Sequence, residues 1–210
     1  MHSKKKDAKA LPCQDGKVRD LETVFVSTPI GDMVIVVCQN GLHRIYQKQD
    51  ITDENFQPDI RKRVELIGPP CLGAEIKSIV EKCVLWLQVY FQNPTEVSKI
   101  ISPNLCPIKS EGALFRDRVL LTLAKSTPAG KTITYGELAS MAGSPGAQQA
   151  VGTTMATNPF QLLVPCHRVV KSGQLVGKYS GGCRNSVKIW LLEFEGMKVN
   201  RENGTISSNK

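Results

Sequence analysis

The sequence predicts a mixed α/β (α+β) protein, in which a small antiparallel β-meander with one long helix precedes a mostly helical second half. In the first half, β-branched runs alternate with turn signals, among them Asn40-Gly41, the dipeptide most typical of a two-residue hairpin. The second half instead shows helical spacing of apolar residues, helix caps and glycine stops. At 210 residues the chain is long enough for one large domain or two small ones.

Three short strands are expected in the first half. Each is rich in β-branched residues, and a proline-glycine turn or the Asn-Gly dipeptide separates neighbouring runs. Because connections this short join strands that run in opposite directions, the three strands form an antiparallel meander. The strands are expected over residues 21–27, 33–39 and 42–47.

A long helix is expected after the polar loop 50–63. It covers residues 75–91 and ends before Asn93-Pro94. Apolar residues recur along one face at helical spacing, so this face is expected to pack on the meander. The apolar stripe consists of Ile76, Ile79, Val80, Cys83, Leu87, Tyr90 and Phe91.

The second half begins with a helix over residues 114–125. Thr134 and Glu137 then match a capping box, which starts a short helix that ends at Gly143. Ser144 and Pro145 fit the N-cap and first position of a further helix, which extends to about residue 157. Two short helices joined through a glycine turn predict a helix-turn-helix, although helical hairpins also occur in proteins that do not bind DNA.

The ends of the chain and its composition bound the function. Residues 1–20 and 199–210 are polar and are expected to be a disordered basic arm and a disordered tail. The domains are expected over residues 21–108 and 109–198. A net charge of +8 favours an anionic partner but is also common on solvated surfaces. The arm fits DNA contact or nuclear import as well as a solvated tail.

Seven cysteines occur in a chain without the apolar core of a signal peptide or any stretch long enough to span a bilayer. We therefore expect a reducing compartment and no membrane partner, with cysteines present as thiols or metal ligands.

The segment LLVPCHRVV, residues 162–170, is predicted to be a short buried strand that carries Cys166, His167 and Arg168. A nucleophilic cysteine with a nearby base is one interpretation, and a buried structural thiol beside a satisfied histidine is the other. Successive side chains of a strand point to opposite faces. The imidazole therefore reaches the sulfur only if the chain turns at Pro165–Cys166 or if a water relays the proton.

The last helix is expected over residues 186–195, capped by Asn185 and ended by Gly196. Glu195 falls in its last turn, where a carboxylate opposes the helix dipole. This placement indicates either a cationic partner, with His167 as a candidate, or a solvated helix end. The buried stripe of the helix consists of Val187, Trp190, Leu191 and Phe194.

These features together resemble the O6-alkylguanine-DNA alkyltransferases. The resemblance lies in LLVPCHRVV, in ITYGELASMAGSP and AVGTTMATNPF before it, and in VGKYSGG and KIWLLEFEG after it, with a weaker extension in CQNGLHRI. It implies a small ribonuclease-H-like domain followed by a winged helix-turn-helix-like domain. It also implies a methylated-DNA–protein-cysteine methyltransferase that binds duplex DNA through the minor groove and flips out O6-alkylguanine, with O4-alkylthymine a poorer substrate.

The resemblance implies one role for each matching residue. Cys166 accepts the alkyl group irreversibly, and His167 deprotonates it through a water. Glu195 orients His167, and Tyr135 donates its hydroxyl to the leaving guanine.

Further positions match contacts to the base and to DNA. Ser180 helps to bind the alkylated oxygen and Tyr179 lines the pocket, while backbone carbonyls at Cys166 and Val169 receive the exocyclic amine. Asn158 connects the second helix of the helix-turn-helix, which would contact the DNA, to the active-site segment. The positions that match DNA contacts are Arg116, Tyr135, Gly136, Ser144, Gln149 and Ser172.

Two departures from the family pattern stand out. In the second helix of the helix-turn-helix, the family usually has an arginine that holds the gap left by the flipped base, and this chain has Gln149 at that position. A basic residue that is common earlier in the same helix is replaced by Gly146. Some members bind zinc in the first domain. Their ligands are two cysteines and two histidines. Cys38 and His43 match two of these positions, Cys106 stands where a histidine is usual, and Cys13 lies near the position of the fourth ligand. This set fits one structural zinc or free thiols with a surface histidine.

We therefore expect a monomeric nuclear DNA repair protein whose partner is duplex DNA containing O6-alkylguanine. Two alternatives are a lesion sensor that binds alkylguanine without repairing it and an unrelated cysteine hydrolase. The presence of Cys166 disfavours the sensor, and nothing in the sequence points to the oxyanion hole that a hydrolase needs.

Overall fold

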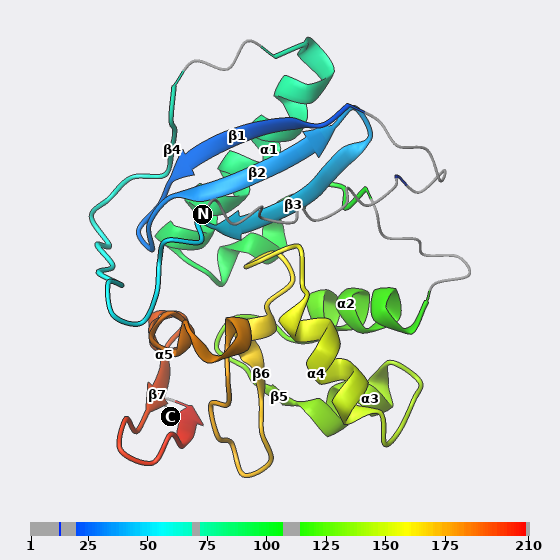
Figure 1. Ribbon diagram of the computed structural model, residues 1–210, viewed down its shortest axis with the longest axis vertical. Helices are drawn as coiled ribbons and strands as arrows, with labels where there is room; N and C mark the ends of the chain where they lie inside the picture. The colour runs from blue at the N-terminus through cyan, green and yellow to red at the C-terminus, as the bar shows by residue number, and fades with distance from the viewer. Residues whose placement is uncertain (1–12, 14–19, 69–71, 107–113, 209–210) are drawn as a thin grey trace, which may run out of the picture.

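The computed structural model describes residues 13, 20–68, 72–106 and 114–208. The first half forms the predicted antiparallel meander, extended by a short fourth strand in the order β3-β2-β1-β4. The sheet lies over the long helix α1 in one half of the molecule, and helices α2 to α5 make up the other half (Figure 1). The strands are β1 (Glu22–Ser27), β2 (Met33–Cys38), β3 (Gly41–Gln47) and β4 (Glu65–Leu66).

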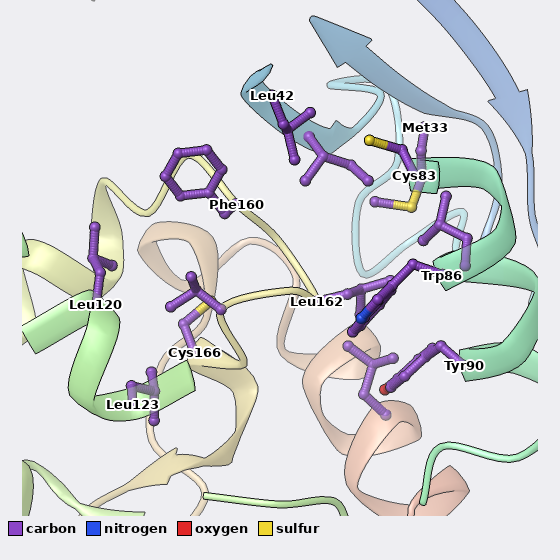
Figure 2. Close-up of a cluster of buried hydrophobic side chains, with 14 of the residues drawn as sticks. Met33, Leu42, Cys83, Trp86, Tyr90, Leu120, Leu123, Phe160, Leu162 and Cys166 are labelled. Carbon is purple, nitrogen blue, oxygen red and sulfur yellow. The ribbon is translucent and has the colours of Figure 1, made fainter. Parts of the chain in front are cut away.

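Helix α1 (Ala74–Gln92) covers the inner face of the sheet, as its apolar stripe predicts. The buried cluster continues from the sheet and α1 to helix α2 of the second half, with Phe160 and Leu162 between them (Figure 2). A single core thus extends across the expected division between the two domains, whose dividing residues lie outside the described ones. Apolar burial of this kind stabilises a fold by about 25 cal/mol per Å².

The second half has the predicted helical order, with two short strands between the helices. The capping box is confirmed, because Thr134 and Glu137 bond reciprocally at the start of α3. The elements are the 3₁₀ turn Glu96–Lys99, α2 (Phe115–Ser126), β5 (Ile133–Thr134), α3 (Tyr135–Met141), α4 (Gln148–Ala156), the 3₁₀ turn Cys166–Arg168, β6 (Val169–Val170), the 3₁₀ turn Ser180–Gly182 and α5 (Asn185–Phe194).

Two predicted helix starts are wrong. Helix α4 begins at Gln148 rather than after Ser144, because Gly146 adopts φ +86° and interrupts the helical path. Asn185 lies inside α5 and its side chain does not cap the helix. Instead, Asp53 from the first half accepts hydrogen bonds from the Ser186 backbone N–H at 2.7 Å and from the Ser186 hydroxyl.

The predicted disordered tail is wrong for residues 199–208. Strands β7 (Met197–Val199) and β8 (Ile206–Ser208) form an antiparallel hairpin. Ile206 is buried in a small cluster with Val170 and Leu192, and this burial holds the tail against α5. The basic arm lies outside the described residues apart from Cys13 and Asp20. Among the helices of the described ranges, none combines the length and the apolar character needed to cross a membrane.

Candidate active site

The segment that carries Cys166 is a sharp turn rather than the regular strand that the sequence predicts. Leu162 has φ +72°, and residues Cys166–Arg168 form a 3₁₀ turn after Pro165. Only Val169–Val170 are strand, and they pair in parallel with β5. A positive φ at a leucine carries a conformational cost that the surrounding packing must offset. The chain thus turns at Pro165–Cys166, but His167 Nδ1 makes no hydrogen bond to Cys166 or to any other described residue.

Cys166 lies at the boundary between the core and a pocket of about 450 Å³. Its side chain is 8% exposed, and burial raises the pKa of the thiol. The side chains of Asn158 and Tyr179 and the ammonium of Lys188 act in the opposite direction and favour the thiolate. The thiol is thus protonated at rest and needs a base before it reacts.

Glu195 is the centre of a buried polar cluster. Its carboxylate accepts hydrogen bonds from His167 Nε2 at 2.8 Å and from the Tyr90 hydroxyl at 2.7 Å. Arg168 donates two more, at 2.8 and 2.7 Å. Burial opposes ionisation, but His167 and Arg168 hold the pKa of this carboxyl well below its usual range. The acid at the helix end therefore has a cationic partner, as its unfavourable position suggests.

His167 is fully buried, and burial lowers its pKa although Glu195 acts to raise it. The neutral imidazole then donates from Nε2 to the carboxylate, which leaves Nδ1 as a hydrogen-bond acceptor. Nδ1 has no hydrogen-bond partner within the described part of the chain. Arg168, which also donates to the Thr127 carbonyl at 2.6 Å, balances the charge of Glu195. The site thus holds an oriented imidazole on the residue that follows the cysteine.

Asn158 connects the end of α4 to the active-site turn, as predicted. Its Nδ2 donates to the Val164 carbonyl at 2.8 Å, and its Oδ1 accepts from the Phe160 backbone N–H at 3.0 Å. A movement of α4 therefore reaches the backbone immediately before Cys166.

Lys188 is a site residue that the sequence interpretation missed. Its side chain is fully buried, and its Nζ donates to the Val169 carbonyl at 2.6 Å. Burial lowers its pKa to about 8, while the neighbouring Cys166 acts in the opposite direction. Glu195 directly follows α5 and is seven residues after Lys188, a spacing that returns to the same side of a helix and was an available signal. The Val169 carbonyl keeps a second lone pair for the predicted contact with the base.

Four of the predicted DNA-contact positions line one hollow of about 510 Å³ at the start of α3 and α4. Burial raises the pKa of Tyr135, and the nearby Cys166 raises it further, so its hydroxyl remains a hydrogen-bond donor at neutral pH. Arg116 and Ser144 are not among the lining residues, and Arg116 pairs with Asp117 at 3.1 Å. The hollow is lined by Tyr135, Gly136, Gln149 and Ser172 together with Gln148, Gly152, Lys171 and Lys178.

The loop after the active-site turn lies against the same pocket as Cys166. Tyr179 and Ser180 line that pocket. Asn185 fixes the loop, because its Oδ1 accepts from the Tyr179 backbone N–H and its Nδ2 donates to the Gly182 carbonyl, both at 2.9 Å. The predicted capping residue of α5 therefore orders the pocket wall instead.

The predicted metal-ligand set comes together where β2 ends and β3 begins. Gly41, at φ +147°, lets Asn104 approach so closely that a Cβ would clash with its carbonyl oxygen. Hydrogen bonds from Leu42 N–H to the Asn104 carbonyl and from Cys106 N–H to the Leu42 carbonyl then bring the two segments together. The donor atoms, which lie within 4.8 Å of one another and could bind a metal, belong to Cys13, Cys38, His43 and Cys106.

Comparisons with known proteins agree with this geometry. Residues 114–197 match the family model "6-O-methylguanine DNA methyltransferase, DNA binding domain". A methylated-DNA–protein-cysteine methyltransferase of Mus musculus is 35% identical over 172 residues, which cover 82% of this chain and 80% of the relative. The chain belongs to the methylated-DNA–protein-cysteine methyltransferase family. The Homo sapiens relative of the same name is 32% identical over 182 residues and covers 87% of this chain and 84% of its own.

Solved structures confirm the alkyltransferase fold of this methyltransferase. The Mycobacterium tuberculosis OGT structure in complex with DNA is 26% identical, with a TM-score of 0.56 over 83% of this chain and 91% of that one. A variant of the O6-methylguanine methyltransferase of the same organism is 27% identical to this chain. Its TM-score is 0.58 over 84% of this chain and 93% of that one. The sequence did not predict several further features of the site besides Lys188. Arg168 and Tyr90 are partners of Glu195, and Lys171 and Lys178 line the hollow.

Proposed function

We propose that this methyltransferase repairs O6-alkylguanine by one irreversible transfer of the alkyl group to Cys166 Sγ. The observation that carries the proposal is the cysteine at the pocket with a neutral histidine beside it, which a buried carboxylate orients. The thiolate attacks the alkyl carbon, the S–C bond forms and the C–O6 bond breaks. Tyr135 donates a hydrogen bond to the guanine as negative charge develops on it. O4-alkylthymine is proposed as a slower substrate.

His167 is the proposed base. Its Nε2 is held by Glu195, so Nδ1 takes the thiol proton, relayed by one water as the family resemblance implies. Lys188 stabilises the thiolate once it forms. Because a thioether does not hydrolyse under physiological conditions, each protein molecule reacts once.

The proposed DNA-binding surface is the hollow at α3 and α4. Lys171 and Lys178 are exposed there and provide cations for phosphates. We propose that the protein binds duplex DNA as a monomer, with α4 in the minor groove. The alkylguanine then flips into the pocket at Cys166. Arg116 and Ser144 are proposed as outer DNA contacts. Nuclear localisation stays a prediction, because the basic arm lies outside the described residues.

A titration with duplex DNA that carries one labelled O6-methylguanine tests the proposed function. Label is expected to move to protein until the two are equimolar and then stop. Catalytic turnover would contradict irreversible transfer, and DNA binding without transfer would support the lesion sensor instead.

Gln149→Arg is expected to increase repair of duplex DNA severalfold. Extruding a paired base costs a few kcal/mol, and an arginine at the exposed start of α4 offsets part of it by filling the gap and adding a charge. The measurement is the second-order transfer rate on duplex and on single strands. The single strand needs no unpairing, so equal gains on both would mean that the arginine acts only through charge. If the transfer rate on duplex DNA did not increase, Gln149 would not be the residue that fills the gap left by the flipped base.

We propose that Cys13, Cys38, His43 and Cys106 bind one structural zinc ion. Tetrahedral zinc with these ligands places sulfurs about 3.8 Å from one another and about 3.6 Å from the imidazole nitrogen. Cys13 Sγ lies 3.8 Å from Cys38 Sγ and 3.6 Å from His43 Nε2. Cys38 Sγ lies 3.6 Å from Cys106 Sγ and 3.2 Å from His43 Nε2. Zinc would cross-link the segment around Cys13 to the sheet.

Protein purified without chelator is expected to contain about one zinc ion per chain. Cys38→Ser is expected to lose the zinc and to lower the melting temperature. Cys83→Ser removes another buried thiol, outside the cluster, and should keep the metal. Elemental analysis that finds no zinc in the wild type would exclude the site.

A further inference from the structure

The pocket at Cys166 has a wall that the proposed chemistry does not use. Strand β3 and the residues after it contribute Arg44, Gln47 and Gln49 to that wall, and Gln161 and Arg184 complete it. We propose that this wall is a polar subsite which selects an acidic O6 substituent, such as carboxymethyl, over a neutral one of equal length. This inference rests on the proposed function and adds a substrate preference to it.

Two buried amide groups supply the first argument. Gln47 is fully buried and Gln161 is 7% exposed, yet Gln47 Oε1 and Gln161 Nε2 have no hydrogen-bond partner among the described residues. The opposite ends of both amides are fixed, because Gln47 Nε2 donates to the Ile30 carbonyl and Gln161 Oε1 accepts from the Gln47 backbone N–H at 2.7 Å. Gln161 lines the pocket, and its Nε2 end is the one that no described residue fixes. A buried polar group without a partner is unfavourable, so a ligand that supplies the missing partner is favoured.

The charge of the wall supplies the second argument. Arg44 and Arg184 both line the pocket, and no carboxylate does. Arg184 donates to the Gln47 and Lys48 carbonyls at 3.3 and 2.8 Å, so its position is fixed while its charge stays unbalanced by any described acid. The Arg44 guanidinium stacks on the Tyr46 ring at 5.0 Å. Two guanidinium groups and a free amide donor match a carboxylate, which accepts several such hydrogen bonds.

The wall consists of residues other than those proposed to hold the base. Tyr135, Ser180 and the carbonyls at Cys166 and Val169 are assigned to the guanine, so the wall is left for the substituent on O6. In the transfer itself the carboxylate does not react. Sγ bonds to the methylene carbon, the methylene–O6 bond breaks, and the guanine leaves as it does from the methyl adduct.

The experiment compares transfer rates from duplexes that carry O6-methyl-, O6-propyl- or O6-carboxymethylguanine. The wild type is expected to prefer carboxymethyl over propyl by about tenfold, as one charge-assisted hydrogen bond would give. Arg44→Gln should reduce this ratio severalfold. Gln161→Glu keeps the acceptor for Gln47 N–H and replaces the free donor with a carboxylate oxygen, so it should reduce the ratio further.

Arg63→Gln is the matched control, since exposed Arg63 lines a different hollow, and its ratio should equal that of the wild type. Arg44 is half-buried on a strand surface, so its variant tests the inference even if Gln161→Glu does not fold. Equal wild-type rates for propyl and carboxymethyl would overturn the subsite. An equal loss on all three substrates in both variants would also overturn it, because the wall would then hold the base. Absence of transfer from O6-methylguanine would instead refute the proposed function.

Discussion

Cys166→Ala is expected to abolish alkyl transfer to the protein and to leave its affinity for duplex DNA nearly unchanged. The thiol is the proposed alkyl acceptor, and its replacement removes the sulfur to which the new bond forms. The hollow with the lysines and α4 does not contain Cys166, so the DNA-binding surface keeps its shape. Transfer of labelled methyl and binding to labelled duplex, measured on the same preparation, give the two quantities.

Cys183→Ser is the matched control for this variant. Its thiol is exposed, lines the same pocket as Cys166 and donates to the Ser180 carbonyl at 2.9 Å. Transfer should persist in this variant. If Cys166→Ala still accepted the alkyl group, another cysteine would be the acceptor and the proposed site would be wrong.

Glu195→Ala is expected to destabilise the protein by about 3–5 kcal/mol, since removing one partner of a buried ion pair leaves the other charge uncompensated. Arg168 would lose both its carboxylate bonds, and Tyr90 and His167 would lose their acceptor. Glu195→Gln keeps an acceptor without the charge and should cost less. Urea unfolding of the wild type and both variants at pH 7 measures these differences.

The pH dependence of stability identifies the charges involved. The pKa of Glu195 is lowered on folding, so its contribution is present above the unfolded pKa of about 4.3 and is lost as the pH falls below it. The pKa of His167 is also lowered, so the wild type loses stability as the pH falls below about 6.5, where the unfolded imidazole takes up a proton. The gap between wild type and Glu195→Gln should therefore narrow below pH 4. A gap that stays constant from pH 7 to pH 3 would mean that Glu195 is not ionised in the fold.

Local signals account for most of what the sequence predicts correctly. The hairpin near Asn40-Gly41, the apolar stripe of α1 and the Thr134–Glu137 capping box each depend on neighbouring residues, and all three are present, although the turn of the hairpin is residues 39–40 and Gly41 already pairs with Cys38. A basic partner for Glu195 was also predictable, because a carboxylate at a helix C-terminus needs a cation nearby, but that cation is Arg168, while His167 donates to Glu195 as a neutral imidazole.

The features that the sequence does not predict depend on distant contacts. The turn at Cys166–Arg168 follows from packing that holds Leu162 at positive φ, and a run of apolar residues around a proline carries no sign of it. Lys188 and Arg168 are ordinarily surface residue types, and their burial follows from acceptors contributed by Val169 and Glu195. The β7–β8 hairpin depends on Ile206, a single apolar residue in a polar tail.

The central claim is that one sulfur takes the alkyl group, and a peptide map tests it most directly. The protein is incubated with duplex DNA containing O6-methylguanine, digested, and analysed by mass spectrometry. One added methyl group on the peptide that contains Cys166, in an amount equal to the lesion consumed, is the predicted result. A methyl group on any other cysteine, or an unmodified protein beside repaired DNA, would contradict it.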